Sequence, residues 1–256
     1  IDTGSHRPFR QALRRHPITQ LDVIDQNVRD MKEQGIIEEA ASPWASNVVL
    51  VKKKDGKYRF CVDYRQLNSI TYQDTYPLPR IDSCLDALAG SRLFSTIDLR
   101  QGYWQVRQDP KDADKTAFIT RRGCFRFRRL SFGLTNAPSV FQRLMDLVLA
   151  GLTWVTALVY IDDIVVFASG FDEHLQRLRE VLQRLRDAGL KMKPSKCSFF
   201  ALEARILGHV VNGDGVHTNP DTIESVRKWP VPSNVRQVRS FLGLCSYYRK
   251  FVPHFA

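Results

Sequence analysis

The sequence predicts a globular fold in which amphipathic helices are combined with antiparallel β-hairpins. The chain has 256 residues, enough for one or two domains with a substantial core. Hydrophobic residues make up 43% and charged residues 25%, which is ordinary for a folded chain and excludes disordered, collagen-like and mucin-like proteins. Apolar residues recur at helical spacing in some segments and form short β-rich runs in others.

The first expected element is a helix over residues 19–35. Its apolar residues follow one another at steps of three and four: Leu21, Ile24, Val28 and Met31. Gly35 stands where a helix commonly ends, because glycine adopts the left-handed backbone of a C-cap without steric cost. We therefore expect one amphipathic helix with a single apolar face.

A hairpin is expected next, formed by β-rich runs at 47–51 and 58–62. The residues between these runs include three consecutive lysines and the pair Asp55-Gly56, and Asp-Gly is a preferred turn sequence. The sequence therefore predicts a hairpin with a basic tip, centred on Asp55-Gly56.

A second hairpin is predicted over 158–167, where two apolar runs flank Asp162 and Asp163. The apolar strand predicted at 93–98 likewise ends in an acid, Asp98. Adjacent ionised carboxylates among apolar residues repel each other and lose hydration, so they need a compensating cation. Mg²⁺ prefers carboxylate and phosphate oxygens, which makes these three acids candidate metal ligands.

If the three acids meet, they can hold two metal ions about 3.5–4 Å apart. Such a pair of ions would activate a 3′-hydroxyl group and neutralise a leaving pyrophosphate. The competing interpretation of an Asp-Asp pair is a solvent-exposed turn. The apolar residues on both sides of Asp162-Asp163 favour the metal site.

Three more helices are predicted in the second half of the chain. Regularly spaced apolar residues predict a helix over 173–188. Asn219 and Pro220 are typical of a helix N-cap and first helical residue, and Pro230 is expected to end that helix. A last helix is expected to begin at Ser233, in a basic tail without acidic residues.

Charge and cysteine content narrow the class of protein. Thirty-eight Lys and Arg against 27 Asp and Glu leave a net charge of +11, an excess typical of proteins that bind nucleic acid. The apolar runs are far shorter than the roughly 20 residues of a membrane-spanning helix, so no membrane partner is expected. The five cysteines form no C-x-x-C pair, which predicts reduced intracellular thiols.

Four motifs give the chain a strong resemblance to reverse transcriptases, in the order and spacing found in that family. They are FCVDYRQLN at 60–68, FSTIDLRQGY at 94–103, LSFGLTNAP at 130–138 and YIDD at 160–163. The chain most resembles the polymerase segment of gypsy-class LTR retrotransposon polyproteins. The segments SPWAS at 42–46 and FLGLCSYY at 241–248 are also typical of that class.

The resemblance implies an α+β, right-hand polymerase fold whose palm is an antiparallel sheet backed by helices. Residues 1–72 and 106–136 would form the fingers, and residues 73–105 and 137–213 the palm. Residues 214–256 would form part of a helical thumb and the start of the connection.

The resemblance also implies an activity and its metal ligands. The chain is expected to be an RNA-directed DNA polymerase, a nucleotidyltransferase that adds dNTPs to a primer 3′ end on an RNA or DNA template. Asp98 and Asp162 would be the two principal ligands of two Mg²⁺ ions, which Mn²⁺ could replace. Asp163 matches the second acid of the hairpin, which binds metal less consistently in the family.

By the same resemblance, four residues would contact the incoming nucleotide. Tyr103 occupies the sugar-gate position, where a bulky ring would clash with a ribose 2′-hydroxyl group. Phe132 stands where many retroviral relatives have glutamine, so it could only pack against the base or the ribose. Lys53 and Arg59 would hold the triphosphate. Lys52 or Lys54 could replace Lys53 in this role.

Further residues would contact the primer and the template. Leu207 and Gly208 resemble the primer-grip turn. Arg121, Arg126 and Arg128, with Arg122 and Arg129 nearby, could follow template phosphates along one strand face. The lysine that protonates pyrophosphate is left open among three candidates: Lys191, Lys193 and Lys196.

Two alternatives remain at this stage. One is a domesticated, catalytically inactive nucleic-acid-binding relic of the same fold, which the intact acids argue against. The other is an RNA-dependent RNA polymerase, which Tyr103 argues against. The chain lacks an initiator methionine, so we expect a piece of a polyprotein normally linked to ribonuclease H and integrase segments. We expect it inside the cell, in cytoplasmic retrotransposon particles or in the nucleus.

Overall fold

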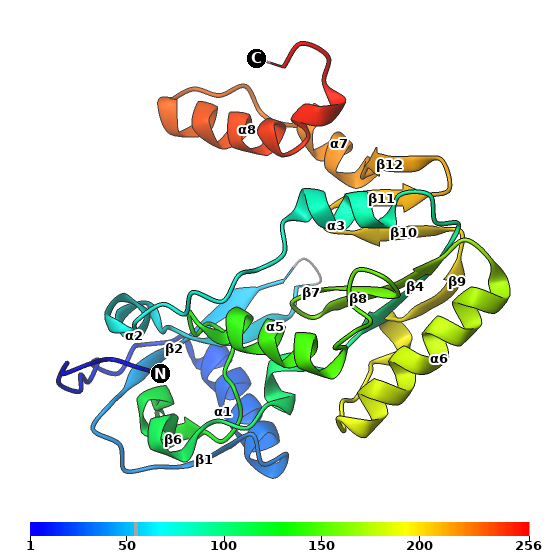
Figure 1. Cartoon of the computed structure of the whole chain (residues 1–256). Helices are drawn as coiled ribbons and strands as arrows, with labels where there is room; N and C mark the ends of the chain where they lie inside the picture. Colours follow the sequence, from blue (N-terminus) through cyan, green and yellow to red (C-terminus); the bar gives the residue numbers. More distant parts are fainter. Residues whose placement is uncertain (54–55, 256) are drawn as a thin grey trace. The chain divides into compact units, whose positions relative to one another are not determined.

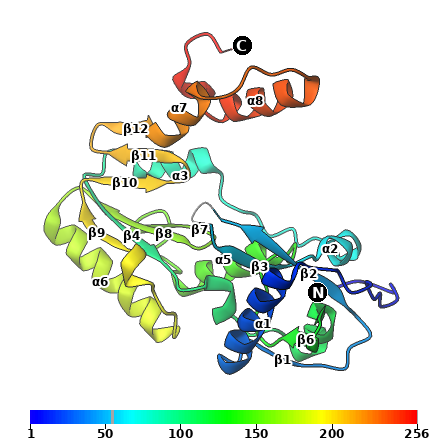
Figure 2. The ribbon, with the colours of Figure 1, turned by 180° about the vertical axis from the view of Figure 1, so that it is seen from behind.

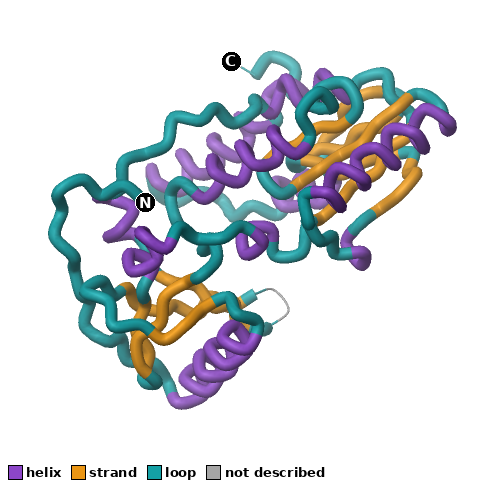
Figure 3. Tube along the Cα trace, turned by 60° about the horizontal axis from the view of Figure 1, so that its bottom comes forward, coloured by secondary structure: helices purple, strands orange, loops and turns teal. Residues whose placement is uncertain are grey.

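The computed structural model describes residues 1–53 and 56–255, which form two compact units (Figure 1). We call them unit 1 (residues 1–78, 99–148 and 188–191) and unit 2 (residues 79–98, 149–187 and 192–256). Both units contain helices and strands (Figure 3), so the predicted α+β class is confirmed. The boundaries of fingers, palm and thumb remain predictions.

Unit 1 contains a five-stranded sheet in the order β1-β6-β5-β2-β3. Its strands are β1 (Ile37–Glu39), β2 (Ser46–Lys52), β3 (Tyr58–Val62), β5 (Phe118–Thr120) and β6 (Gly123–Phe127). β2 and β3 pair antiparallel from Val48↔Val62 to Lys52↔Tyr58, which confirms the first predicted hairpin. The predicted basic tip includes Lys54, and the predicted turn centre includes Asp55. Both of these residues lie outside the part of the chain that the structure describes.

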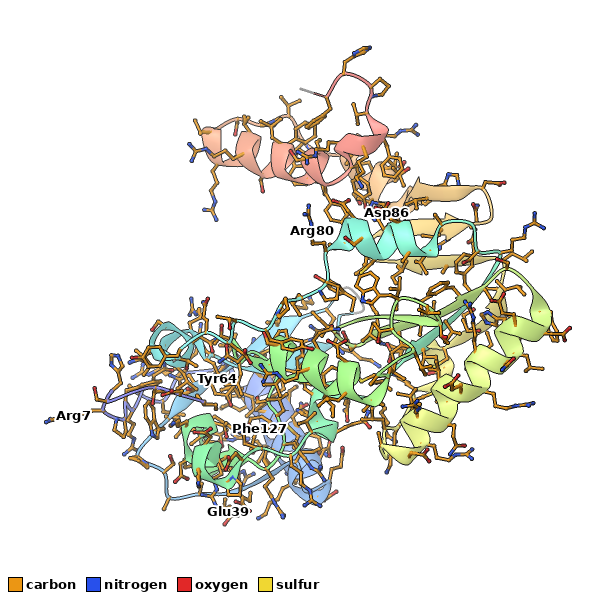
Figure 4. All side chains as sticks on the ribbon, in the orientation of Figure 1. Arg7, Glu39, Tyr64, Arg80, Asp86 and Phe127 are labelled. Atoms are coloured by element: carbon orange, nitrogen blue, oxygen red, sulfur yellow. The ribbon has the colours of Figure 1, made fainter. Side chains whose placement is uncertain are left out.

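The helices of unit 1 cover its apolar core. They are α1 (Ile18–Glu33), α2 (Arg65–Ile70), α4 (Pro110–Ala113), α5 (Ala137–Val148) and the 3₁₀ turns η1 (Gly102–Gln105) and η2 (Asp114–Thr116). α1 buries Ile24, Val28 and Met31, as its spacing predicted. Tyr64 and Phe127 belong to the same core and lie among the crowded side chains of this unit (Figure 4).

Unit 2 contains two antiparallel sheets. The four-stranded sheet has the order β7-β8-β4-β9 and the three-stranded sheet the order β10-β11-β12. The strands are β4 (Leu93–Asp98), β7 (Ala157–Tyr160), β8 (Asp163–Ala168), β9 (Ser198–Ala201), β10 (Glu203–Ile206), β11 (His209–Asn212) and β12 (Gly215–Thr218). β7 and β8 confirm the second predicted hairpin, and β4 confirms the strand that ends in Asp98.

Helices α3 (Ile81–Leu88) and α6 (Phe171–Asp187) pack against the sheets of unit 2. The unit also contains α7 (Pro220–Arg227), α8 (Val235–Tyr247) and the 3₁₀ turns η3 (Pro194–Lys196) and η4 (Arg249–Phe251). α3 lies beside β10 and β11 (Figures 1 and 2), and its residues Leu85 and Leu88 share a core with Ile206 and Val211. Each sheet of unit 2 thus has at least one helix of its own unit packed against it.

The start of α8 differs from the prediction. Asn234, not Ser233, is the N-cap, because its side-chain oxygen accepts a hydrogen bond from the Gln237 N–H at 2.9 Å. Ser233 instead donates its own N–H and hydroxyl group to the Gln237 side chain. The predicted cap of α7 is confirmed, since Asn219 accepts a hydrogen bond from the Asp221 N–H.

Two further predictions can be checked against the described residues. No helix within residues 1–53 and 56–255 is both long enough and apolar enough to cross a bilayer. All five cysteines are free thiols, as their number and spacing predicted.

A buried histidine couples α6 to β4. His174 is fully buried, and its Nε2 lies 2.7 Å from the Ser95 hydroxyl oxygen. Burial, with a smaller contribution from Arg177, lowers the pKa of His174 below its ordinary value. The folded protein therefore binds a proton at this site less readily than the unfolded chain does.

We expect the protein to lose stability as the pH falls below about 6.5, because the unfolded chain then takes up a proton that folded His174 resists. His174→Gln should flatten this dependence, measured as the urea midpoint at pH 7.5 and 5.5. The exposed His217→Gln variant is the control and should keep the parent's pH dependence. An unchanged pH dependence in His174→Gln would contradict the assignment.

Candidate active site

The strand register of unit 2 brings the three predicted acids to one end of its four-stranded sheet. Asp98, the last residue of β4, pairs directly with Asp163, the first residue of β8. Tyr160 pairs with Asp163 across the hairpin, so Ile161 and Asp162 form its two-residue turn. Residues more than 60 positions apart in the sequence therefore meet at this point.

The turn that carries Asp162 has an unusual backbone. Ile161 has a φ of 57°, in the left-handed region that β-branched residues rarely adopt. Two-residue hairpin turns need a positive φ at their first central residue, which explains the conformation but not the choice of isoleucine. Strained backbone of this kind is concentrated at functional sites.

Loss of hydration and repulsion both act on the carboxylates of this site, and one cation lies beside them. Asp163 is exposed at the end of the strand, yet partial loss of hydration of its carboxyl group raises its pKa. Repulsion from Asp162 and Asp98 raises that pKa further. The Lys196 ammonium donates to Asp98 Oδ2 at 2.9 Å, and this hydrogen bond raises the pKa of Lys196.

The donor set suits Mg²⁺, since three carboxylates at one sheet end supply hard oxygen ligands and need positive charge. The side chains do not, however, form a ready metal cage. Within residues 1–53 and 56–255, no group of three or more His, Cys, Asp or Glu side chains is arranged to hold an ion. Lys196 bonds one oxygen of Asp98 instead. The metal role of the three acids therefore stays a prediction.

Tyr103 and Phe132 belong to an aromatic cluster in unit 1. The Tyr103 ring lies 4.9 Å from that of Phe132 and 5.4 Å from that of Phe141. A Cβ atom on Gly102 would lie 3.0 Å from the Phe141 ring, so a larger residue here would need that ring to shift. Phe132 is 47% exposed, which leaves one ring of the cluster open to a ligand.

Lys53 and Arg59 lie at the end of the β2–β3 hairpin, also in unit 1. Arg59 pairs in register with Val51, and the Lys53 N–H donates to the Lys57 carbonyl oxygen at 2.8 Å. Both side chains are exposed. Neither forms an ion pair with the residues that the structure describes. Both charges therefore lie on the exposed surface of this hairpin.

Two of the predicted template arginines have partners within unit 1 that the sequence did not reveal. Arg121 forms ion pairs with Asp22 at 3.0 Å and Asp25 at 2.9 Å. Burial would raise the pKa of Asp25, but hydrogen bonds from Arg121 and Arg122 outweigh it and lower that pKa. These contacts fasten α1 to the β5–β6 turn.

Arg126 is held in the same way, by Glu38 at 2.7 Å and Asp114 at 2.8 Å. Arg128 is 61% exposed and lies 3.7 Å from Glu38, so it is the least constrained of the three. A template role for Arg121 and Arg126 would have to compete with these ion pairs.

The predicted primer-grip residues form the turn between β10 and β11 in unit 2. Leu207 has a φ of 48° and Gly208 a φ of 71°, and Ile206 pairs with His209 on either side. This is a tight two-residue turn in a left-handed conformation.

The chain matches the family model described as reverse transcriptase (RNA-dependent DNA polymerase) over residues 51–211. It belongs to the reverse transcriptase family. The predicted motifs at 60–68, 94–103, 130–138 and 160–163 all fall within the matched segment.

Curated relatives place this reverse transcriptase among LTR retrotransposons, as predicted. The chain is 41% identical to the retrovirus-related Pol polyprotein from transposon 297 of Drosophila melanogaster, covering 95% of the chain and 24% of that protein. It is 36% identical to the corresponding polyprotein from transposon gypsy, covering 92% of the chain and 23% of that protein. The chain is 31% identical to the Tf2-3 polyprotein of Schizosaccharomyces pombe, and the match covers 96% of the chain and 18% of that protein. The chain thus spans about a quarter or less of these relatives.

Solved structures of foamy viral protease-reverse transcriptase share the fold at 26% identity. The complex with an RNA/DNA hybrid has a TM-score of 0.88 and covers 99% of this chain and 34% of that one. A complex with double-stranded DNA has a TM-score of 0.91, and the match covers 100% of this chain and 53% of that one. The predicted α+β polymerase fold is thereby confirmed.

Proposed function

We propose that this reverse transcriptase segment is an active RNA-directed DNA polymerase that extends a primer by adding dNTPs. The observation that carries the proposal is the register of β4 and β8, which pairs Asp98 with Asp163 next to Asp162. Family membership supports the reaction class. The foamy viral relatives are described in complexes with RNA/DNA hybrid and double-stranded DNA, which supports a template-primer as substrate.

Asp98 and Asp162 would hold Mg²⁺, with Asp163 as a third ligand. The bound ions would activate the primer 3′-hydroxyl group and neutralise the charge of the leaving pyrophosphate. To bind Mg²⁺, Asp98 would give up its ion pair with Lys196, since the metal ion and the ammonium group compete for the same carboxylate. Lys196 would then be free to interact with a phosphate oxygen.

Lys196 is the best candidate for the proton donor to pyrophosphate. Of the three lysines in this segment, it is the one whose ammonium group bonds a proposed catalytic acid in the described structure. Its ammonium group carries the proton that a general acid gives up.

In unit 1, Lys53 and Arg59 would bind the triphosphate of the incoming nucleotide, and Tyr103 with Phe132 would contact its sugar and base. The exposure of both cations and the packing of the Tyr103 ring on Phe132 support these roles. Cytoplasmic particles or the nucleus would be the place of action.

The proposal is tested by primer extension on an RNA template with Mg²⁺ and dNTPs. We expect extension that stops when the ions are chelated. Binding of the template-primer without any extension would instead support the inactive relic. Preferential use of rNTPs would support an RNA polymerase.

Two neighbouring arginines, Arg126 in β6 and Arg128 just after it, provide a test of the template contacts. Arg128→Ala should reduce the slope of log affinity against log salt concentration by about 1, because one phosphate contact is lost. Arg126→Ala should leave that slope unchanged and lower the free energy of unfolding by up to about 1 kcal/mol, because it removes two internal ion pairs. Filter binding across a salt series and urea unfolding measure the two effects. A reduced slope in Arg126→Ala together with an unchanged slope in Arg128→Ala would contradict the template contact assigned to Arg128.

A further inference from the structure

The turn between β10 and β11 is held by two tyrosines that follow each other near the end of α8. The Tyr247 hydroxyl donates to the Leu207 carbonyl oxygen at 2.5 Å. The Tyr248 hydroxyl donates to the Gly208 carbonyl oxygen at 2.7 Å. Each of the two turn residues thus has its carbonyl group fixed by a separate phenol from a segment 40 residues away.

The turn needs this support. Leu207 and Gly208 both have positive φ values, and a leucine in the left-handed region is strained. The conformation therefore persists only if surrounding groups enforce it. The His209 ring contributes as well, since its Nδ1 lies 2.8 Å from the Leu207 oxygen.

The fit between the turn and the tyrosines is close. A Cβ atom on Gly208 would lie 3.2 Å from the Tyr248 hydroxyl oxygen and 3.4 Å from the Tyr247 ring. His209 is buried, and its ring lies 5.2 Å from that of Tyr247 and 5.3 Å from that of Tyr248. Glycine at 208 thus serves both the backbone conformation and the approach of the two phenols.

The tyrosines are also the point where α8 is anchored. Neither α7 nor α8 buries a residue along its length, whereas Tyr248, just after α8, is 5% exposed. Next to it, Lys250 forms an ion pair with Asp82 of α3 at 2.6 Å. Burial raises the pKa of Tyr247, so its hydroxyl group stays a donor over an even wider pH range than that of an exposed tyrosine.

We propose that Tyr247 and Tyr248 are positioning residues that hold the Leu207–Gly208 turn in the conformation required to seat the primer 3′ end. They would act through the turn and would not touch the reacting atoms. The role of the turn itself rests on the proposed function. The contact between the tyrosines and the turn does not.

The test uses the double variant Tyr247→Phe/Tyr248→Phe, which removes both hydroxyl groups and keeps both rings. Ser225→Ala is the matched control, because it removes a hydroxyl donor to a backbone carbonyl, at 2.8 Å, on α7 of the same unit. Hydrogen–deuterium exchange of a peptide covering 203–212 should speed up at least about fivefold in the double variant and not in the control. This measurement does not depend on catalysis.

The second readout is single-nucleotide extension of a DNA primer on an RNA template. We expect the maximal extension rate of the double variant to fall about tenfold, while its affinity for the template-primer, measured by fluorescence anisotropy, changes less than about twofold. Gly208→Ala should produce the same pattern with both tyrosines present, since its Cβ atom would displace the Tyr248 hydroxyl group.

The outcomes separate the two proposals. Unchanged exchange at 203–212 in the double variant overturns the positioning role. Faster exchange with an unchanged extension rate also overturns it, since the order of the turn would then not matter to the primer. If the parent protein extends no primer, the proposed polymerase activity fails. Photo-crosslinking of a 4-thiothymidine primer end to 203–212 then decides the positioning role: crosslinks lost in the double variant support it, and equal crosslinks overturn it.

Discussion

Asp162→Asn is expected to abolish primer extension, lowering its rate by on the order of 10³-fold or more, equivalent to about 4 kcal/mol of transition-state stabilisation. Asparagine keeps the size of the side chain and removes the negative charge that would hold Mg²⁺. Asp98→Asn should have an equally large effect, because Asp98 and Asp162 are the proposed principal ligands. Extension of a labelled primer on an RNA template over a Mg²⁺ series measures both.

The control for this prediction is Asp214→Asn, which removes an exposed acid from the β11–β12 turn of the same unit. It should extend the primer like the parent. Template-primer affinity and the unfolding midpoint of Asp162→Asn should stay close to those of the parent, because Asp162 is an exposed turn residue. Equal extension by parent and Asp162→Asn would show that the metal assignment is wrong.

Tyr103→Val is expected to raise the use of ribonucleotides relative to deoxyribonucleotides by on the order of 10²-fold, a typical size for a steric change of this kind in a binding pocket. The Tyr103 ring packs against Phe132 and Phe141, so it has a defined position from which to exclude a 2′-hydroxyl group. The smaller valine would open that space. Competing dCTP and CTP incorporation opposite one template guanosine measures the ratio.

Tyr103→Phe is the matched control, because it keeps the ring and loses only the hydroxyl group. Its nucleotide preference should be that of the parent. If both variants change the preference equally, the phenol hydroxyl and not the bulk of the ring makes the selection. If neither does, the sugar-gate assignment fails.

Local sequence signals predicted four helices and two hairpins, because these depend on neighbouring residues, but they did not predict α2, α3 or α5. The helix over 19–35 and the hairpin around Asp162-Asp163 appear close to their expected positions as α1 and as β7 and β8. The start of α8 was missed by one residue, because Ser233 and Asn234 are both good N-caps and only their partners in the folded chain distinguish them.

Long-range partners could not be predicted in the same way. Three lysines, Lys191, Lys193 and Lys196, have the same side-chain chemistry in the sequence, and only the folded chain shows which one bonds Asp98. The arginine-rich stretch of β5 and β6 has the composition of a nucleic-acid contact, yet Arg126 is paired with Glu38 and Asp114. The motif that contains Tyr247 and Tyr248 was recognised without any sign that both donate to the Leu207–Gly208 turn.

The sequence by itself determined four of the helices, two hairpins, the strand that ends in Asp98, the reverse transcriptase family and the identity of the three candidate acids. It could do so because helical periodicity, turn chemistry and motifs are written in adjacent residues. Only the tertiary structure decided that Asp98 faces Asp163, that Lys196 bonds Asp98, and that the arginines and tyrosines have partners within their own units. Strand register and side-chain direction set these contacts between distant segments, and neither property is contained in any local stretch of the chain.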